Sequence, residues 1–197
     1  MARDTRERIV TTARDLVHAA TYADVGVDDV CRAAGVNKGS LYHFFPSKQA
    51  LGLAVLDRNW ELMRGLLDEA FDAEAPPLDR LDAFLTAYAS MMRTMREHLG
   101  ATPGCPLGNL AAELSAHEPD MRARIAEVLT AWTDRVASVV RDAQARGDVD
   151  PSFDATEAAR GVVALVQGYG VLAKADDDPT ALDALRPLVR RLLPAPH

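Results

Sequence analysis

The residues best suited to chemistry lie together in one short run, which extends from Gly35 to Leu51. Apart from Ser47, which is expected to cap a helix, five side chains in this run carry an ammonium, hydroxyl, phenol or imidazole group. They are Lys38, Ser40, Tyr42, His43 and Lys48. All of these groups donate hydrogen bonds, and such donors bind phosphate oxygens and the acceptor edges of bases. We therefore interpret the run as a surface that is presented to DNA.

Two short helices are expected to position this run. One covers about residues 27–34 and ends at Gly35, which suits the left-handed end of a helix. The next covers about residues 38–45 and stops at Pro46. A helix of about seven residues is not stable alone, because nucleation costs more than so few hydrogen bonds return. Neighbouring elements must hold it, and its apolar anchors are Leu41, Phe44 and Phe45. Two short helices joined by a tight turn match the helix-turn-helix pattern, whose second helix lies in the major groove.

The rest of the chain also has the apolar spacing of helices, without strand-like alternation. A first helix begins near Asp4, and Ser47 is a good N-cap for a long connector helix. Further helices are expected at about 78–98, 108–117, 119–146, 155–174 and from 178 onward. The last of these should kink or split at Pro187. We predict an all-α fold of about nine helices, with a three-helix head at residues 1–47 and a helical body at residues 48–197.

Length, composition and charge exclude several classes of protein. An apolar content of 48% is ample for a core. No apolar run approaches the roughly 18–20 residues that span a bilayer. The N-terminus lacks the apolar centre of a signal peptide, so we expect a cytoplasmic protein with no membrane contact. The net charge is −7, yet residues 1–50 hold seven basic and six acidic side chains. A near-neutral head on an acidic body can bind DNA if its basic groups share one face.

The run GVNKGSLYHFFPSKQAL resembles the signature of tetracycline-repressor-type (TetR/AcrR) transcriptional regulators, and the resemblance covers residues 5–55 without a gap. It implies a homodimer whose heads bind a pseudo-palindromic operator and whose bodies bind a small-molecule inducer that releases DNA. The resemblance implies a transcriptional regulator, most simply a repressor. It implies neither an enzymatic activity nor the need for a cofactor. The implied DNA-contacting residues are Asn37, Lys38, Gly39, Ser40, Tyr42, His43 and Lys48. The family commonly places Thr or Ser just before Val27, where this chain has Gly26, so no contact is implied there.

Aromatic and methionine side chains of the body mark a candidate ligand pocket. They lie on or beside the expected core stripes, where ordinary packing is one interpretation. Three methionines within five residues, beside Tyr88, also suit an adaptable apolar cavity, and the family resemblance favours a cavity. The candidate ligand-binding residues are Trp60, Met63, Phe84, Tyr88, Met91, Met92, Met95, Cys105, Asn109 and Trp132. We expect an inducer that is apolar or electrophilic.

A second motif surrounds Cys105. The run from Gly104 to Glu113 resembles the Gly-Cys-x-x-Gly-Asn-x-x-x-Glu element of one branch of these regulators, some of which sense electrophiles through a related cysteine. A helix N-terminus stabilises a thiolate, which supports a thiol sensor, and an inert buried cysteine is the alternative. Asn109 and Glu113 would either meet a ligand or cap the preceding loop. An all-helical cysteine enzyme remains a further alternative, but it lacks a recognisable His or Asp partner.

The remaining candidates concern packing, metals and assembly. Cys31 is expected to be a packing residue, and His18, His98 and His117 lack the spacing of metal ligands. Three glycines in the helix expected at 155–174 would each cost about 1 kcal/mol relative to alanine, unless another helix approaches closely. A four-helix bundle across a two-fold axis would supply that approach, with packing inside the chain as the alternative. The expected dimer residues are Gly161, Leu165, Gly168, Tyr169, Leu172, Leu185 and Val189.

Overall fold

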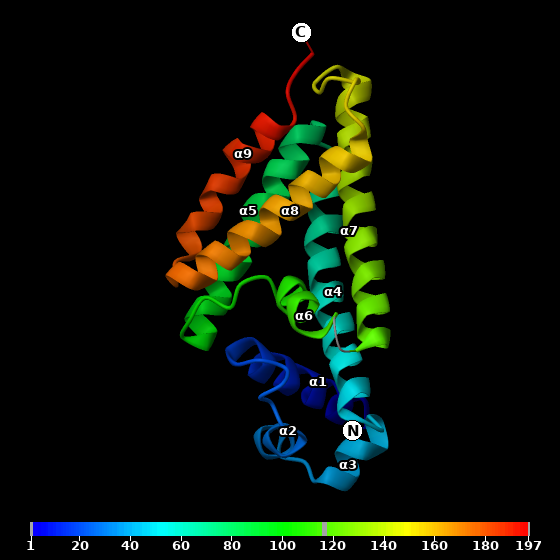
Figure 1. Cartoon of the computed structure of the whole chain (residues 1–197), viewed down its shortest axis with the longest axis vertical. Helices are drawn as coiled ribbons and strands as arrows, with labels where there is room; N and C mark the ends of the chain where they lie inside the picture. Colours follow the sequence, from blue (N-terminus) through cyan, green and yellow to red (C-terminus); the bar gives the residue numbers. More distant parts are fainter. Residues whose placement is uncertain (1, 116–117, 197) are drawn as a thin grey trace. The chain divides into compact units, whose positions relative to one another are not determined.

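The computed structural model describes residues 2–115 and 118–196, and in this part of the chain it contains nine α-helices, one 3-10 segment and no β-strand (Figure 1). The predicted all-α fold is confirmed. The elements are α1 (Ala2–Ala19), α2 (Val27–Ala34), α3 (Lys38–Phe44), α4 (Lys48–Phe71), α5 (Pro77–Leu99), α6 (Pro106–Leu114), α7 (Pro119–Arg146), α8 (Ala155–Asp176), η1 (Pro179–Ala184) and α9 (Leu185–Leu192). The end of the helix expected at 108–117, with His117, lies outside the described residues.

The chain packs into two compact units. The first unit comprises the chain up to Leu62 together with Pro106–Ile125, and so contains α1, α2, α3, α6 and the adjoining ends of α4 and α7. The second unit comprises Met63–Cys105 and the chain from Ala126 onward. The predicted functional boundary at residue 47 falls inside the first unit and stays a prediction.

Local hydrogen bonds explain why the short helices begin and end where they do. Gly35 closes α2 in the left-handed region, at φ 62° and ψ 42°, as its residue type predicts. Asn37 begins α3 because its side-chain oxygen accepts from the Ser40 N–H at 2.7 Å. The Ser47 hydroxyl in turn accepts from the Ala50 N–H at 3.0 Å, which confirms it as the cap of α4.

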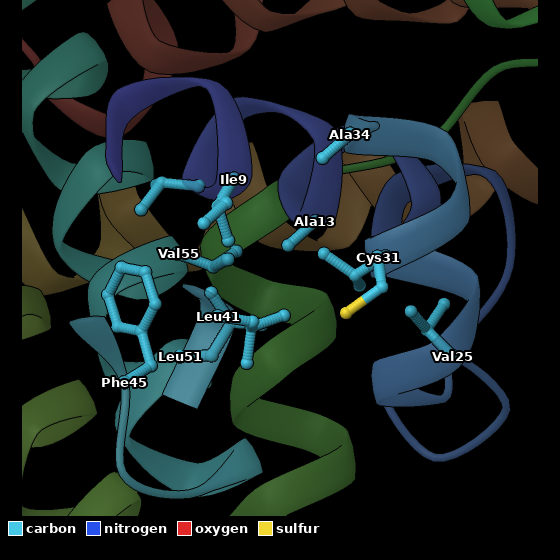
Figure 2. Close-up of a cluster of buried hydrophobic side chains, with 11 residues drawn as sticks. Ile9, Ala13, Val25, Cys31, Ala34, Leu41, Phe45, Leu51 and Val55 are labelled. Carbon is cyan, nitrogen blue, oxygen red and sulfur yellow. The ribbon is translucent and has the colours of Figure 1, made fainter. Parts of the chain in front are cut away.

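A compact apolar cluster holds α3 in place (Figure 2). Leu41 of α3 is fully buried, and Phe45, which follows the helix, is 3% exposed. They pack with Ile9 of α1, Cys31 of α2 and Val55 of α4. The first four helices therefore share one core. Burial of Leu41 and Phe45 supplies the stability that so short a helix lacks by itself. The burial of Cys31 agrees with the packing role expected for it.

Aromatic rings form the centre of the second unit. The Phe84 ring of α5 lies edge-on to Trp132 of α7, with 6.1 Å between ring centroids, and 6.3 Å from the Tyr88 ring. All three residues are fully buried. A Phe71 ring from the end of α4 joins them at 5.6 Å from Phe84.

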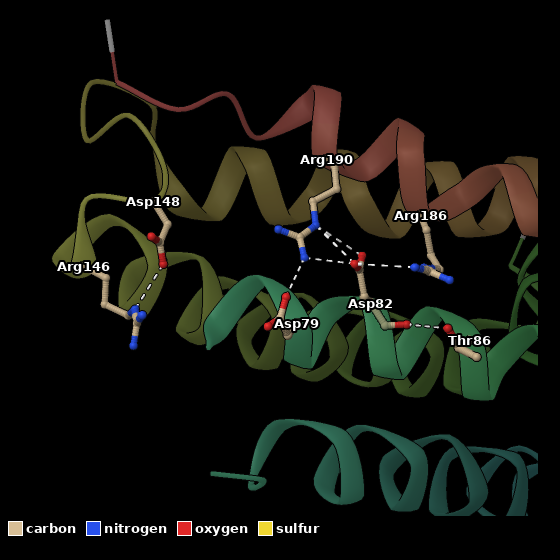
Figure 3. A network of polar contacts seen from close by, with 7 residues as sticks. All are labelled: Asp79, Asp82, Thr86, Arg146, Asp148, Arg186 and Arg190. Carbon is tan, nitrogen blue, oxygen red and sulfur yellow. Dashed lines mark hydrogen bonds and ion pairs between the residues drawn. The ribbon is translucent and has the colours of Figure 1, made fainter. Parts of the chain in front are cut away.

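Arginine–aspartate pairs fix α9 against α5 inside the second unit (Figure 3). The Arg190 guanidinium reaches Asp79 and Asp82 at 2.9 Å each, and Arg186 approaches Asp82 at 4.0 Å. The expected break in the last helix occurs two residues before Pro187, where η1 gives way to α9. Proline therefore lies in the first turn of α9, where no backbone hydrogen bond is lost.

Candidate nucleic-acid interface and ligand site

The face of α3 opposite Leu41 is polar and exposed. Lys38, Tyr42 and His43 are exposed, with Tyr42 at 46%, and Ser40 is half-buried. The His43 ring packs edge-on against Phe44, with 5.1 Å between ring centroids, which limits its rotation. A helix that anchors one apolar face and presents donors on the other has the form needed to enter a DNA groove.

Lys38 forms an ion pair that the sequence did not reveal. Its ammonium lies 2.9 Å from the Asp28 carboxylate of α2, and both side chains are more than half exposed. The hydrogen bond to Asp28 is the largest cause that raises the Lys38 pKa, so the lysine stays charged. An exposed ion pair of this kind contributes little to stability. The Lys38 ammonium can therefore leave Asp28 and bind a phosphate at little cost.

Asn37, Gly39 and Gly26 have local structural roles. The Asn37 side-chain oxygen is occupied by the cap of α3, which leaves its amide nitrogen as the donor for a partner. A Cβ on Gly39 would lie 3.3 Å from that oxygen, so a larger residue would crowd the cap. Gly26 begins α2 with extended backbone and donates its N–H to the Asp29 carboxylate at 3.0 Å, which is the bond that the third helical residue contributes to a capping box.

Lys48 points at the loop between α1 and α2. Its Nζ donates to the Ala23 carbonyl at 3.1 Å and lies 4.7 Å from the centroid of the Tyr22 ring. The lysine is half-buried at the N-terminus of α4. An ammonium has three donors, so this contact leaves two of them for a phosphate.

Glu113 of α6 binds the same loop from another side. Its Oε2 accepts from the Tyr22 N–H at 3.0 Å, and its Oε1 accepts from the Ala23 N–H at 2.6 Å. These contacts give Glu113 a structural role in the loop between α1 and α2 and not in the loop preceding α6, and its contact with a ligand stays a prediction. No pattern in the sequence pairs residue 113 with residues 22 and 23.

The predicted ligand residues divide between the two units. Trp60 and Asn109 belong to the first unit and are half-buried. The others belong to the second unit, where the most buried members are Met63, Phe84, Tyr88, Met92, Cys105 and Trp132. Met91 and Met95 of α5 are half-buried. The structure thus brings together a buried subset of the predicted residues and not the whole set.

Cys105, Tyr88 and Gly170 meet in the second unit. Cys105 is 3% exposed and directly precedes α6. A Cβ built on Gly170 would lie 3.2 Å from the Cys105 backbone nitrogen and 3.5 Å from the Tyr88 hydroxyl. Burial, followed by the Cys105 thiol, raises the Tyr88 pKa well above its usual range, so the phenol is neutral. A side chain in place of this glycine would require the Cys105 backbone to shift by a few tenths of an ångström.

Several side chains of the second unit carry buried polar atoms, and Tyr88 of this cluster is one of them. The Tyr88 hydroxyl lies beside the Cys105 thiol, and the Trp132 indole nitrogen and the Gln167 amide make no hydrogen bond with any described residue. Each buried polar group left unsatisfied costs about 1–3 kcal/mol. An ordered water, or a bound molecule with acceptor atoms, would remove this cost. The core of the second unit is therefore chemically suited to a ligand that is mostly apolar and carries an oxygen acceptor.

The predicted dimer residues occupy two different environments. Leu172 of α8 is 52% exposed, and Gly168 has no neighbour within 4 Å of the place that a Cβ would take. A Cβ built on Gly161 would lie 3.0 Å from the Leu192 side chain of the same chain, so at this glycine the packing is internal. Leu165 and Tyr169 are half-buried. The prediction for Leu185 and Val189 requires correction, because both are at most 1% exposed and their apolar surface is used inside the chain.

Metal centres and membrane spans would be two other kinds of functional feature. No group of three or more His, Cys, Asp or Glu side chains among the described residues is arranged to hold a metal ion. No helix in residues 2–115 and 118–196 is both long and apolar enough to cross a membrane.

Family comparisons match both ends of the chain. Residues 9–55 match the family described as "Bacterial regulatory proteins, tetR family", and residues 77–189 match "Tetracyclin repressor-like, C-terminal domain". The first match contains the α2–α3 region and the start of α4, and the second contains the Tyr88–Cys105–Gly170 cluster.

Individual relatives agree with these matches. The chain is 41% identical over 68% of its length to the transcriptional regulator AcuR of Cereibacter sphaeroides, although the match spans only 59% of that relative. It is 32% identical over 60% of its length to the transcriptional repressor NemR of Escherichia coli, spanning 58% of NemR. A solved regulatory protein TetR from Rhodobacter sphaeroides is similar with a TM-score of 0.85 and 31% identity, over 95% of this chain and 98% of that one.

Proposed function

This chain belongs to the TetR family of bacterial transcriptional regulators, and we propose that it is a repressor that leaves its DNA operator when a small molecule binds. As a regulator it is not an enzyme. NemR, one of its relatives, is named a transcriptional repressor, which supports this direction of control. We also propose that it acts without a cofactor in the cytoplasm, where bacterial DNA lies.

The exposed polar face of α3 carries this proposal. Lys38, Tyr42 and His43 project from a helix whose other face is anchored by Leu41. Lys48 adds an ammonium at the start of α4, where the free N–H groups of the first turn also attract phosphate. In this arrangement Tyr42 and Lys48 bind the DNA backbone, and the α3 side chains approach base edges in the major groove.

A gel-shift experiment tests the DNA-binding proposal. The full chain is incubated at low salt with duplexes from the region upstream of its own gene, beside Lys38→Ala and Lys174→Ala variants. Lys174 is an exposed lysine of α8 in the second unit, so its loss is a matched change in charge. We expect the wild type and Lys174→Ala to shift one duplex and Lys38→Ala to bind it more weakly. Failure of the wild type to bind any of these duplexes at low salt would contradict the proposal.

The inducer is proposed to bind in the second unit beside Tyr88 and Cys105. The buried polar groups of Trp132 and Gln167, together with the Tyr88 hydroxyl, support a small, mostly apolar molecule with an oxygen acceptor. We also assign the chain to the branch marked by the Gly-Cys-x-x-Gly-Asn run, on the basis of Gly104 to Asn109. A Tyr88→Phe variant is expected to bind this molecule with lower affinity than the wild type, because one hydrogen-bond donor is lost.

A thiol sensor is the second candidate, and the position of Cys105 directly before the N-terminus of α6 favours it, because a helix N-terminus stabilises a thiolate. Because Cys105 is only 3% exposed, an electrophile can react with it only when the loop before α6 opens. Release of DNA by an electrophile, compared between wild type and Cys105→Ser, separates the two candidates. Release that is unchanged in Cys105→Ser would eliminate the thiol sensor, and release that is abolished would favour it over a reversible ligand.

A homodimer is proposed to form through the exposed face of α8. Val171 and Leu172 are 64% and 52% exposed, and the open surface at Gly168 lies one turn before them. Two heads held by a dimer would bind half-sites of a pseudo-palindromic operator about 34–36 Å apart, or a multiple of that spacing. Sedimentation equilibrium of a Leu172→Glu variant tests this, with dissociation to monomers as the expected result and an unchanged mass as the contrary one.

A further inference from the structure

The loop between α1 and α2 is held by one carboxylate. The two oxygens of Glu113 accept hydrogen bonds from two consecutive backbone N–H groups, those of Tyr22 and Ala23, at 3.0 and 2.6 Å. A carboxylate that satisfies two donors at once fixes the direction of both peptide groups. All three residues belong to the first unit, together with the DNA-binding residues.

The peptide carbonyl of Ala23 then continues the contact to Lys48. The Lys48 ammonium donates to this carbonyl at 3.1 Å and rests 4.7 Å from the centroid of the Tyr22 ring. Ala23 is therefore bound on its N–H side by Glu113 and on its C=O side by Lys48. Two charged groups from α6 and α4 meet through one residue of the loop.

Packing restricts the loop as well. Tyr22 is 9% exposed and lies against Gly52 of α4, where a Cβ would come within 2.6 Å of its ring. Burial is the largest cause that raises the Tyr22 pKa to about 12, and the charges of Glu118 and Glu113 add to it. The Tyr22 phenol is therefore neutral. The positive charge that contacts its ring is the Lys48 ammonium.

We propose that Glu113 is a positioning residue for DNA binding, which acts by fixing the Ala23 peptide and thereby the Lys48 ammonium at the N-terminus of α4. This inference rests on the proposed DNA-binding function. A lysine side chain that is already ordered loses less freedom when it binds a phosphate, so binding is tighter. Because an ammonium has three donors, Lys48 keeps its bond to Ala23 while it binds DNA.

A change of charge at Glu113 tests the proposal directly. Glu113→Gln keeps the size of the side chain, but its amide nitrogen faces a backbone N–H and cannot accept from it. The probe is the duplex that the wild-type protein selects from a random-sequence library, and affinity is measured by fluorescence anisotropy over a range of salt. We expect Glu113→Gln to bind about tenfold more weakly. The plot of log affinity against log salt should also become less steep by about 1, as for one lost phosphate contact.

A matched control removes the effect of net charge. Glu69→Gln takes one exposed carboxylate from α4 and changes the charge of the chain by the same amount. We expect its affinity to equal that of the wild type or to exceed it slightly. Glu113→Asp provides a second variant, which keeps the charge and withdraws the oxygens by one methylene. It should also weaken binding, whereas a role for negative charge alone predicts wild-type affinity.

A double-mutant cycle shows whether Glu113 acts through Lys48. Lys48→Gln should weaken binding by itself, and adding Glu113→Gln to it should cause little further loss. Hydrogen exchange of the Tyr22 and Ala23 amides should be faster in Glu113→Gln and unchanged in Glu69→Gln. Additive losses in the cycle, or a Glu113→Gln affinity equal to that of Glu69→Gln, would overturn the proposal. A wild type that selects no duplex would instead count against the DNA-binding function itself.

Discussion

The α3 surface and the Tyr88–Cys105–Gly170 cluster differ in how they are built. The first is exposed and polar, and its functional side chains lie within a few residues of one another along the chain. The second is buried, and α5, the loop before α6 and α8 each contribute one residue. A partner reaches the first surface without any movement of the protein. A ligand reaches the second only when the core opens.

This difference makes distinct demands on the fold. The α3 surface requires an anchor beneath a helix that is too short to be stable alone. The buried cluster requires close approach of backbones, which Gly170 permits at the Cys105 nitrogen. Substitutions that target each requirement should therefore have different magnitudes and different readouts.

Removal of the anchor should have the largest effect. Leu41→Ala deletes a fully buried side chain beneath α3 and should lower the free energy of unfolding by about 2–5 kcal/mol. Leu41→Met conserves volume and should cost less than about 1.5 kcal/mol. Urea denaturation of both variants provides the measurement. A loss in Leu41→Ala of only about 0.5 kcal/mol, as for an ordinary surface change, would mean that α3 does not depend on this core.

Two glycines of α4 should respond with opposite sign. A Cβ at Gly52 would lie 2.6 Å from the Tyr22 ring, so Gly52→Ala should destabilise the chain by about 1–3 kcal/mol and weaken DNA binding. Gly65 has no neighbour within 4 Å of that position, and Gly65→Ala should stabilise the helix by about 0.5–1 kcal/mol. Thermal denaturation distinguishes them, and equal shifts in both variants would contradict the close packing of Tyr22.

Much of the first region was predictable because its determinants are local. The Gly35 turn, the Ser47 cap and the end of α3 before Pro46 each depend on residues only a few positions apart. The apolar spacing likewise places Leu41 and Phe45 on the buried side. Hydrogen bonds of short range leave a readable pattern in the sequence.

Contacts between distant residues were not predictable in the same way. Glu113 binds Tyr22 and Ala23, which lie 91 and 90 residues away in the sequence. The sequence of α6 alone gives no sign of these partners. The helical spacing of Leu185 and Val189 marks them as apolar but does not distinguish a neighbour in the chain from a second copy. The arrangement of helices in space decides which surface an apolar stripe covers.

The buried cluster should respond more weakly, and mainly through Cys105. Gly170→Ala places a Cβ 3.2 Å from the Cys105 backbone nitrogen, which must then shift by a few tenths of an ångström. We expect a loss of about 1 kcal/mol, because overpacking exceeds the gain in helix propensity. Labelling of Cys105, followed by peptide mass spectrometry, should be faster than in the Gly65→Ala control. Unchanged labelling would show that Gly170 does not hold the cysteine in place.

The smallest effect is expected at Asp177, which holds the loop before Cys105. Its carboxylate accepts from the Thr102 N–H at 2.8 Å, and this bond, followed by Arg96, lowers the Asp177 pKa. A lowered pKa means that the contribution is complete above the ordinary value of about 3.9 and is lost as pH falls through the folded value.

Hydrogen exchange of the Thr102 amide measures this contribution. In the wild type, protection should persist from pH 6 down to the ordinary Asp pKa of about 3.9 and should be lost only as the pH falls further, through the lowered folded pKa. Asp177→Asn tolerates the same left-handed backbone, at φ 49°, and should leave Thr102 less protected at pH 6. Equal protection in both proteins at pH 6 would contradict the role of the carboxylate.

Hydrogen–deuterium exchange of the full chain, with and without the duplex that it selects, tests the division between the two regions most directly. The prediction is slower exchange on DNA binding in α3 and the first turn of α4, from Asn37 to about Leu51, with the Tyr88–Cys105–Gly170 cluster unchanged. Slower exchange confined to the second unit, or no change at saturating duplex, would contradict the assignment of DNA binding to the α3 surface.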